Sequence, residues 1–228
     1  SELAVTEDGK YIASINAAAA QMMDEITVKI VGAEESEKTY TIRQYADAVL
    51  ADESLSLYHN MVREMLSYGA AAQRYFDYCA DTPADAGITD TGLVEIPEAV
   101  DQELTVTGSA EGVSFYAATL SYRDRIAVRF YFRFTGDITQ YTFTVNGKDC
   151  NPGLKNGWYY VDATDIMPED LDQQITVTVT DGSGNTLSVT YGPMNYIVRM
   201  NAKGDENVKN LMKALYNYYL AAKALRVN

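Results

Sequence analysis

Histidine and cysteine are scarce in this sequence, and their scarcity limits the chemistry that the chain can perform. Its 228 residues include one histidine, His59, and two cysteines, Cys79 and Cys150. A catalytic nucleophile needs a base within hydrogen-bond reach. The sequence also lacks a Gly-x-Ser-x-Gly elbow, a His-Glu-x-x-His pair and a glycine-rich phosphate loop ahead of a helix. We therefore expect a protein that is not an enzyme and that uses no cofactor and no metal.

Basic residues and long apolar runs are also lacking. Acidic residues number 32 against 18 Lys and Arg, so the net charge is −14. Nucleic acids and anionic membranes are bound by basic faces, and no apolar run reaches the ~18 residues of a membrane helix. We expect neither a nucleic-acid partner nor membrane insertion. The two cysteines allow at most one disulfide, and the sequence leaves open whether they are bridged.

The sequence does contain one apolar pattern twice. Near the C-terminus, apolar residues recur at steps of three and four, which predicts one buried stripe on a helix over residues 207–225. These residues are Val208, Leu211, Met212, Leu215, Tyr218, Tyr219, Ala222 and Leu225. Subtracting 150 gives a second series: Tyr58, Met61, Val62, Met65, Tyr68, Gly69, Ala72 and Tyr75. The second series predicts a helix over residues 57–78.

The match continues ahead of both helices. Residues 26–31 (ITVKIV) resemble 175–180 (ITVTVT) at an offset of 149, and residues 40–45 resemble 191–196 at an offset of 151. The offset changes only at turns, where insertions are tolerated. The sequence thus indicates an internal repeat of strand, turn, strand, short helix and long helix. Gly69 replaces Tyr219 in this alignment, which predicts that another backbone or a bulky side chain approaches the first helix closely there.

The domain organisation follows from these patterns. Residues 1–80 are interpreted as a partial first repeat, a β-hairpin plus helix, and residues 81–102, which carry Pro, Gly and acids without a period, as a linker. Residues 103–228 contain short strands separated by turn residues, which favours an immunoglobulin-like β-sandwich with a docked C-terminal helix. We predict an α+β, mainly β, fold. Because the first copy lacks counterparts of residues 103–150, we expect the chain to belong to a longer protein.

One strand offers a candidate binding face. Residues 125–134 alternate, so that one face is wholly apolar while Arg129, Tyr131 and Arg133 share the other. Arg129, Tyr131 and Arg133 could stack on sugar rings or contact an acidic partner. Trp158 and Tyr159, which follow a Pro-Gly loop, are a second candidate. The alternative for both sets is packing against a neighbouring helix or hairpin.

Two acidic segments resemble catalytic or metal sites only superficially. Asp181, Ser183 and Asn185 are spaced like the start of a calcium loop, but Gly192 stands where such a loop places its bidentate Glu. We interpret residues 181–185 as a hairpin turn. The acids between residues 162 and 172 lack a recognisable catalytic context, and we interpret them as a solvated loop.

Several longer runs carry a resemblance to a known family. They are YTIRQYADAVL at 40–50, MLSYGAAAQRYF at 65–76, YTFTVNG at 141–147, YYVD at 159–162, DLDQQITV at 170–177 and LMKALYNY at 211–218. From about Met22 onward, the chain resembles the C-terminal repeat region of secreted and cell-surface proteins of clostridia-type gut bacteria, which often carry leucine-rich repeats. That region has no assigned activity. The resemblance therefore implies an extracellular or cell-surface location and other domains in a longer parent chain, rather than a mechanism.

These inferences lead to two expectations for function. The first is a non-catalytic extracellular module that acts as a spacer or mediates adhesion or protein interaction. The alternative is a carbohydrate-binding module attached to a secreted glycan-degrading enzyme, which the sandwich pattern and the 18 tyrosines favour. The expected partner is accordingly an extracellular protein or a glycan.

Overall fold

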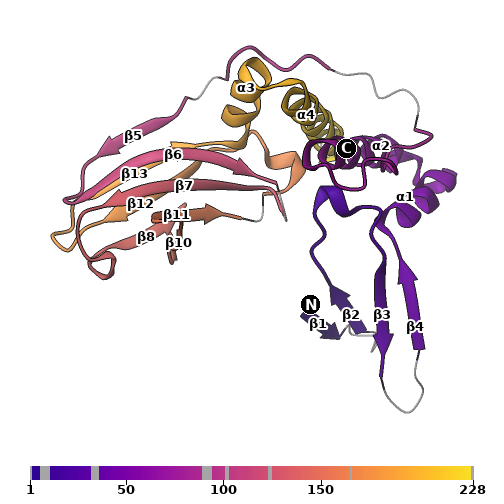
Figure 1. The fold of residues 1–228 in the computed structure, drawn as a ribbon, viewed down its shortest axis with the longest axis horizontal. Coiled ribbons are helices and arrows are strands. Elements are labelled where there is room, and N and C mark those ends of the chain that lie inside the picture. The colour runs from indigo at the N-terminus through magenta and orange to yellow at the C-terminus, as the bar shows by residue number, and fades with distance from the viewer. Residues whose placement is uncertain are drawn as a thin grey trace.

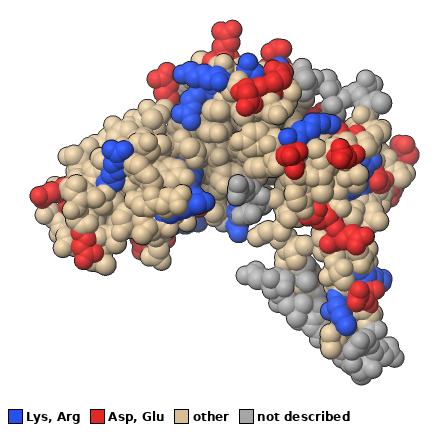
Figure 2. Space-filling view, in the orientation of Figure 1, with Lys and Arg blue, Asp and Glu red and all other residues tan. Residues whose placement is uncertain are grey.

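In the computed structural model, two packed sheets lie beside a group of helices, and two short hairpins extend away from the helices (Figure 1). The structure describes residues 2–5, 11–31, 36–88, 94–100, 103–122, 125–164 and 166–226, and only the backbone of residues 2–5, 11 and 13. The fold is α+β with mostly strands, as the sequence predicts. On the face shown in Figure 2, acidic side chains gather over the helical end, while the sheets carry fewer charges.

Both large sheets are antiparallel and come from residues 105–191. The five-stranded sheet has the order β5 (Thr105–Gly108), β13 (Thr186–Tyr191), β12 (Ile175–Thr180), β8 (Thr142–Val145) and β9 (Lys148–Cys150). The four-stranded sheet has the order β10 (Gly153–Lys155), β11 (Trp158–Ala163), β7 (Ala127–Phe134) and β6 (Val113–Ser121). A short 3-10 helix, Ile138–Gln140, lies between β7 and β8.

The core between these sheets is formed by apolar residues at alternate positions of the strands. Val128, Phe130 and Phe132 of β7 are buried together with Val177 and Val179 of β12 in one apolar cluster. Residues at every second position of a strand share a face, so both sheets turn one apolar face inward. The arrangement is compatible with a β-sandwich.

One expected pairing is wrong. The Asn146-Gly147 turn and the Pro-Gly loop between residues 141–145 and 158–161 predict that these two segments form a hairpin, yet β8 and β11 lie in different sheets. The Asn146–Gly147 turn instead joins β8 to the three-residue strand β9, and β11 pairs with β7 and the equally short β10. Strands of three residues are too short to show an alternation, so the pattern in the sequence could not reveal them.

Nearly the same order of elements occurs twice along the chain, except that the first series has a 3-10 turn between its two helices that the second does not show. The first series is β1 (Glu2–Val5), β2 (Tyr11–Ser14), a 3-10 turn at Ala19–Gln21, β3 (Ile26–Ile30), β4 (Ser36–Tyr40), α1 (Ile42–Ala51), a 3-10 turn at Glu53–Leu55, and α2 (Ser56–Phe76). The second series is β10, β11, a 3-10 turn at Pro168–Asp170, β12, β13, α3 (Pro193–Lys203) and α4 (Glu206–Arg226). We refer to these series as the first and second units. Both long helices contain 21 residues.

The two units also share their strand register. Ile26 pairs with Tyr40, just as Ile175 pairs with Tyr191. One step along, the hydroxyl oxygens of Thr27 and Thr39 are 3.1 Å apart on the polar face of the hairpin. The equivalent hydroxyls, on residues 176 and 190, are 2.8 Å apart.

Matching hydrogen bonds extend into the turns. The Arg43 N–H donates to the Met22 carbonyl at 3.0 Å, and the Met194 N–H donates to the Leu171 carbonyl at 3.0 Å, at the offsets of 151 and 149 read from the sequence. In the first turn of each short helix, a side chain also accepts a hydrogen bond from the backbone N–H of the N-cap residue. Gln44 does so for residue 41 at 3.0 Å, and Asn195 does so for residue 192 at 2.8 Å. Such contacts fix where a helix begins.

The long helices of the two units pack against each other. Tyr68 of α2 stacks on Tyr218 of α4, with ring centroids 6.1 Å apart. These tyrosines differ by 150 in number, so equivalent residues meet across the contact. Tyr68 joins the core of the sheets, while Leu66 belongs to a second apolar cluster with α1. Helix α2 thus lies between two cores and joins them.

Gly69 explains how closely the first unit packs around α2. A Cβ built on Gly69 would lie 2.5 Å from the Met22 sulfur and 3.1 Å from the Ala19 carbonyl oxygen. The prediction that another segment approaches this glycine closely is therefore confirmed. The segment is the 3-10 turn ahead of β3.

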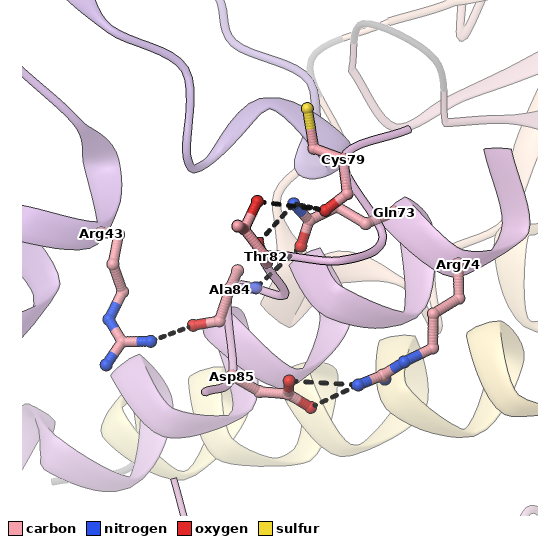
Figure 3. A network of polar contacts seen from close by, with 7 residues as sticks. All are labelled: Arg43, Gln73, Arg74, Cys79, Thr82, Ala84 and Asp85. Atoms are coloured by element: carbon pink, nitrogen blue, oxygen red, sulfur yellow. Dashed lines mark hydrogen bonds and ion pairs between the residues drawn. The ribbon is translucent and has the colours of Figure 1, made fainter. Parts of the chain in front are cut away.

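A buried glutamine holds the segment that follows α2 (Figure 3). The Gln73 amide donates to the carbonyls of Cys79 and Thr82 at 3.4 and 3.3 Å, and its carbonyl oxygen accepts from the Ala84 N–H at 2.7 Å. Arg43 of α1 donates to the Ala84 carbonyl at 2.6 Å. The start of the expected linker is thereby tied to both helices of the first unit.

Glu64 of α2 is a buried carboxyl in the contact with α4. It is 8% exposed, its Oε2 has no hydrogen-bond partner among the described residues, and it hydrogen-bonds with Asn217 of α4. Burial raises the pKa of this carboxyl, and the bond from Asn217 lowers it by less. A raised pKa in the folded state costs stability as the pH rises through it.

We therefore expect Glu64→Gln to be more stable than the parent at pH 7, because glutamine carries no charge to bury. The two proteins should have equal stability below about pH 4, where the parent carboxyl is protonated in the unfolded chain too. Thermal unfolding at pH 7 and pH 3.5 measures both differences. Glu53→Gln, at an exposed position, is the matched control. A Glu64→Gln variant that is less stable than the parent at pH 7 would contradict the account.

Candidate interaction face on the outer sheet

The candidate site lies on the solvent side of the four-stranded sheet, which we call the outer sheet face. It comprises Tyr116, Arg129, Tyr131, Arg133, Trp158, Tyr160 and Asp162. The inward residues of β7 are in the core, so the intervening residues of the same strand point outward. The structure brings four of the five predicted site residues onto this face: Arg129, Tyr131, Arg133 and Trp158.

Arg129 is held by the neighbouring strand. Its Nε and Nη2 donate to the two Asp162 carboxylate oxygens at 2.6 and 2.7 Å, and the two residues are direct cross-strand partners. The Arg129 guanidinium carbon lies 3.8 Å from the centre of the Tyr160 ring. The hydrogen bonds to Asp162 raise the pKa of Arg129. A bidentate pair with a stacked ring fixes the guanidinium in one orientation.

A second stack lies four residues further along β7, at Arg133. The rings of Tyr116 and Trp158 stack with centroids 4.1 Å apart, and the Arg133 guanidinium carbon lies 4.6 Å from each ring centre. The Tyr116 side chain is exposed, with 53% of the residue accessible. Planar groups held by a sheet lose little conformational freedom on binding, which suits them to recognition.

Tyr116 was missed by the sequence analysis. The register of β6 against β7 shifts between Phe115 and Ala117, which leaves Tyr116 as the extra residue of a β-bulge. A bulge redirects a side chain and breaks the alternation of the strand. The period of two in the sequence therefore gave no signal for this residue.

Tyr159 does not share the outer sheet face, and its prediction as a ligand-facing partner of Trp158 is corrected. It pairs directly with the core residue Phe132, and its ring contacts that of Phe134 edge-on at 5.4 Å. Consecutive strand residues point to opposite faces. Trp158 and Tyr159 therefore cannot form one platform.

The outer sheet face continues into an open hollow of about 550 Å³. Its lining includes Asn16, Ser121, Arg125, Arg129, Asp162 and Thr164. The Arg129 charge is compensated by Asp162, and Arg125 adds a second guanidinium to this polar lining. The face as a whole offers flat rings and guanidinium groups, which bind by stacking and by hydrogen bonds.

The polar residues singled out elsewhere have structural contacts. His59 is buried, and its Nε2 lies 3.0 Å from the Val49 carbonyl oxygen and 3.1 Å from that of Asp52, so it joins the end of α1 to α2. Cys79 and Cys150 are unpaired thiols. Within the described parts of the chain, no three His, Cys, Asp or Glu side chains are grouped so that they could hold a metal ion.

Asp181 organises the turn in which it stands. Its carboxylate accepts from the N–H groups of Glu111, Ser183 and Asn185, each at 2.9 Å. These bonds, led by that from Glu111, lower the pKa of Asp181 to about 2. The Asp181 oxygens that a calcium loop would present to the metal thus accept hydrogen bonds from the backbone.

We expect Asp181→Asn to melt several degrees below the parent at pH 7, because a neutral amide accepts these bonds less strongly. A lowered pKa gives stability that is present above the unfolded pKa and lost as the pH falls through about 2. The two melting temperatures should therefore converge between about pH 4 and pH 2. Asp149→Asn, at an exposed position, is the control. A constant gap at all pH values would contradict the account.

No protein-family model, curated protein or solved structure matches the chain. In the part that the structure describes, no helix is both long enough and apolar enough to cross a membrane. The function must therefore be argued from the outer sheet face itself.

Proposed function

We propose that this protein is a non-catalytic extracellular module, carried by a secreted or surface protein, that binds another protein through its outer sheet face. The observation that carries the proposal is the double stack of Arg129 with Tyr160 and of Arg133 with Tyr116 and Trp158. Trp, Tyr and Arg are the residues that most often dominate the energy of protein interfaces.

The arrangement of the rings favours a protein over a glycan. Tyr116 and Trp158 stack on each other with an angle of 20° between their planes. Each therefore covers one face of the other, and the two do not lie side by side as a flat platform for a sugar chain. A carbohydrate-binding module is the second candidate, because the exposed Tyr116 ring could stack on a single sugar ring.

The proposal includes a finer architecture. We infer that the second unit, with the strands from β5 to β9, forms an immunoglobulin-like sandwich, and that the two units are copies of one repeat. The shared register, the matching turn and cap hydrogen bonds and the equal lengths of α2 and α4 support the repeat. The resemblance to surface proteins of clostridia-type gut bacteria supports the extracellular location and a longer parent chain with other domains.

Binding arrays test the proposed function. The chain and a Tyr116→Ala/Trp158→Ala variant should be applied to an array of extracellular proteins and to a glycan array. We expect the chain to bind specific proteins on the array, and the variant to bind them with an affinity at least about tenfold lower. The reason is that truncating an interface anchor costs more than ~1.4 kcal/mol of binding free energy. Lys213→Ala, a change on α4, is the control. Retention on glycans that the variant loses would favour the second candidate, and equal retention of both proteins would contradict the proposal.

A further inference from the structure

The hairpin β3–β4 of the first unit has an apolar face that the described residues leave largely exposed. Val28 is 43% exposed and Ile30 is 61% exposed. Their counterparts at the offset of 149, Val177 and Val179, are both 0% exposed. Because the register of the two hairpins is the same, the strand pairing does not cause this difference in exposure, which follows from what lies around each hairpin.

The second unit shows what covers such a hairpin. There, β8 pairs with the free edge of β12, β5 pairs with the free edge of β13, and the four-stranded sheet packs on the apolar face. In the described residues of the first unit, β3 and β4 form a two-stranded sheet, as do β1 and β2. Figure 1 shows the β3–β4 hairpin extending from the helices, away from the two large sheets.

The two hairpins of the first unit are therefore marginal structures by themselves. An isolated two-stranded hairpin is barely stable in water, and its free edges expose unpaired N–H and C=O groups that accept another strand. The polar face of β3–β4 carries the paired hydroxyls of Thr27 and Thr39. The outward face of β12–β13 carries the equivalent pair, which includes Thr176. The apolar side of the hairpin is thus the same side that faces the core in the second unit.

We propose that hairpins β1–β2 and β3–β4 are the receiving half of a second β-sandwich, and that they bind a segment of five strands like β5 to β9, carried by another part of a longer polypeptide. One strand of this segment pairs with β3 as β8 pairs with β12. Another pairs with β4 as β5 pairs with β13. The binding mode is strand addition, in which main-chain hydrogen bonds join the partner to an exposed edge.

A second copy of this chain does not fit as the occupant. In every copy, β8 and β5, the strands that would have to pair with β3 and β4, are already paired with that copy's own β12 and β13. The sequence of β4 adds a chemical requirement, because Ser36 and Lys38 stand at the positions of Leu187 and Val189. The partner segment must therefore place a polar or acidic group opposite Lys38.

An extended chain tests this proposal with the sequence at hand. A second copy of residues 103–152, whose inward side is apolar, is joined ahead of residue 2 of a chain with Ser36→Leu and Lys38→Val, so that β4 carries the residues that these strands meet in β13. The unextended chain used for comparison has the same two substitutions, and amide hydrogen exchange is followed by mass spectrometry. We expect the amides of β3 to exchange more than about tenfold more slowly than in the unextended chain, because they become part of a larger sheet. Exchange in β12 should stay the same in both proteins.

The control is a Val28→Asp/Ile30→Asp variant of both proteins. In the extended chain it should abolish the added protection of β3, whereas in the unextended chain it should leave the unfolding midpoint nearly unchanged. Unchanged exchange of β3 in the extended chain would overturn the proposal. Protection of β3 that grows with the concentration of the unextended chain would also overturn it, because a second copy would then be the occupant. The proposal rests on the two hairpins of the first unit, so a failed array screen of the outer sheet face leaves it intact.

Discussion

Val177→Asp should unfold the sandwich, while Val28→Asp should leave the stability of the protein nearly unchanged. The two valines occupy equivalent positions in their hairpins, opposite Val189 and Lys38 respectively. Val177 is fully buried between the sheets, so a carboxylate there has no partner and no water. We expect a loss of more than about 4 kcal/mol in the free energy of unfolding. At the exposed Val28 we expect a change within about 0.5 kcal/mol.

Urea denaturation followed by far-ultraviolet circular dichroism measures both changes. Val177→Ala and Val28→Ala are the matched controls, since they remove side-chain volume without adding charge. Alanine should cost about 2 kcal/mol at Val177 and almost nothing at Val28. A Val28→Asp protein as unstable as Val177→Asp would mean that β3 is buried in solution, and the exposed hairpin would then be wrong.

Gln73→Leu should destabilise the first unit by about 3 kcal/mol. Leucine fills nearly the same volume but makes none of the three hydrogen bonds that Gln73 provides to the backbone of residues 79, 82 and 84. Each buried backbone group left unpaired costs roughly 1–3 kcal/mol. The exposed residues of this segment, Cys79 and Thr82, have water as an alternative partner, so the three costs do not add in full.

The matched control is Gln44→Leu, which removes an exposed glutamine that accepts from the Thr41 N–H. Its cost should be below about 1 kcal/mol, as is usual for an exposed helix cap. Urea titration of both variants gives the comparison. Equal costs for the two glutamines would show that the segment after α2 does not depend on Gln73.

The sequence predicted the two long helices better than the pairing of the strands. The expected helices at 57–78 and 207–225 correspond to Ser56–Phe76 and Glu206–Arg226, because a stripe with steps of three and four is specific for a helix. The contact between α2 and α4 could not be predicted from this apolar pattern. Both helices carry more than one apolar side, and periodicity does not say which neighbour covers each side.

The candidate site was predictable in part. Alternation along β7 correctly assigned Arg129, Tyr131 and Arg133 to one face, because the strand has no irregularity. The partners from other strands depend on register, and register is a tertiary property. That is why Tyr160 and Asp162 were not recognised as partners of Arg129, and why Tyr116 was hidden by its bulge.

Amide hydrogen exchange on the unmodified chain tests the central claim most directly. That claim is that two hairpins of the same register differ in what covers their apolar faces. We predict that the amides of β12, residues 175–180, exchange only with global unfolding. The amides of β3, residues 26–30, should exchange orders of magnitude faster, through local opening of an unsupported hairpin. Equal protection of β3 and β12 in a monomeric sample would contradict the account.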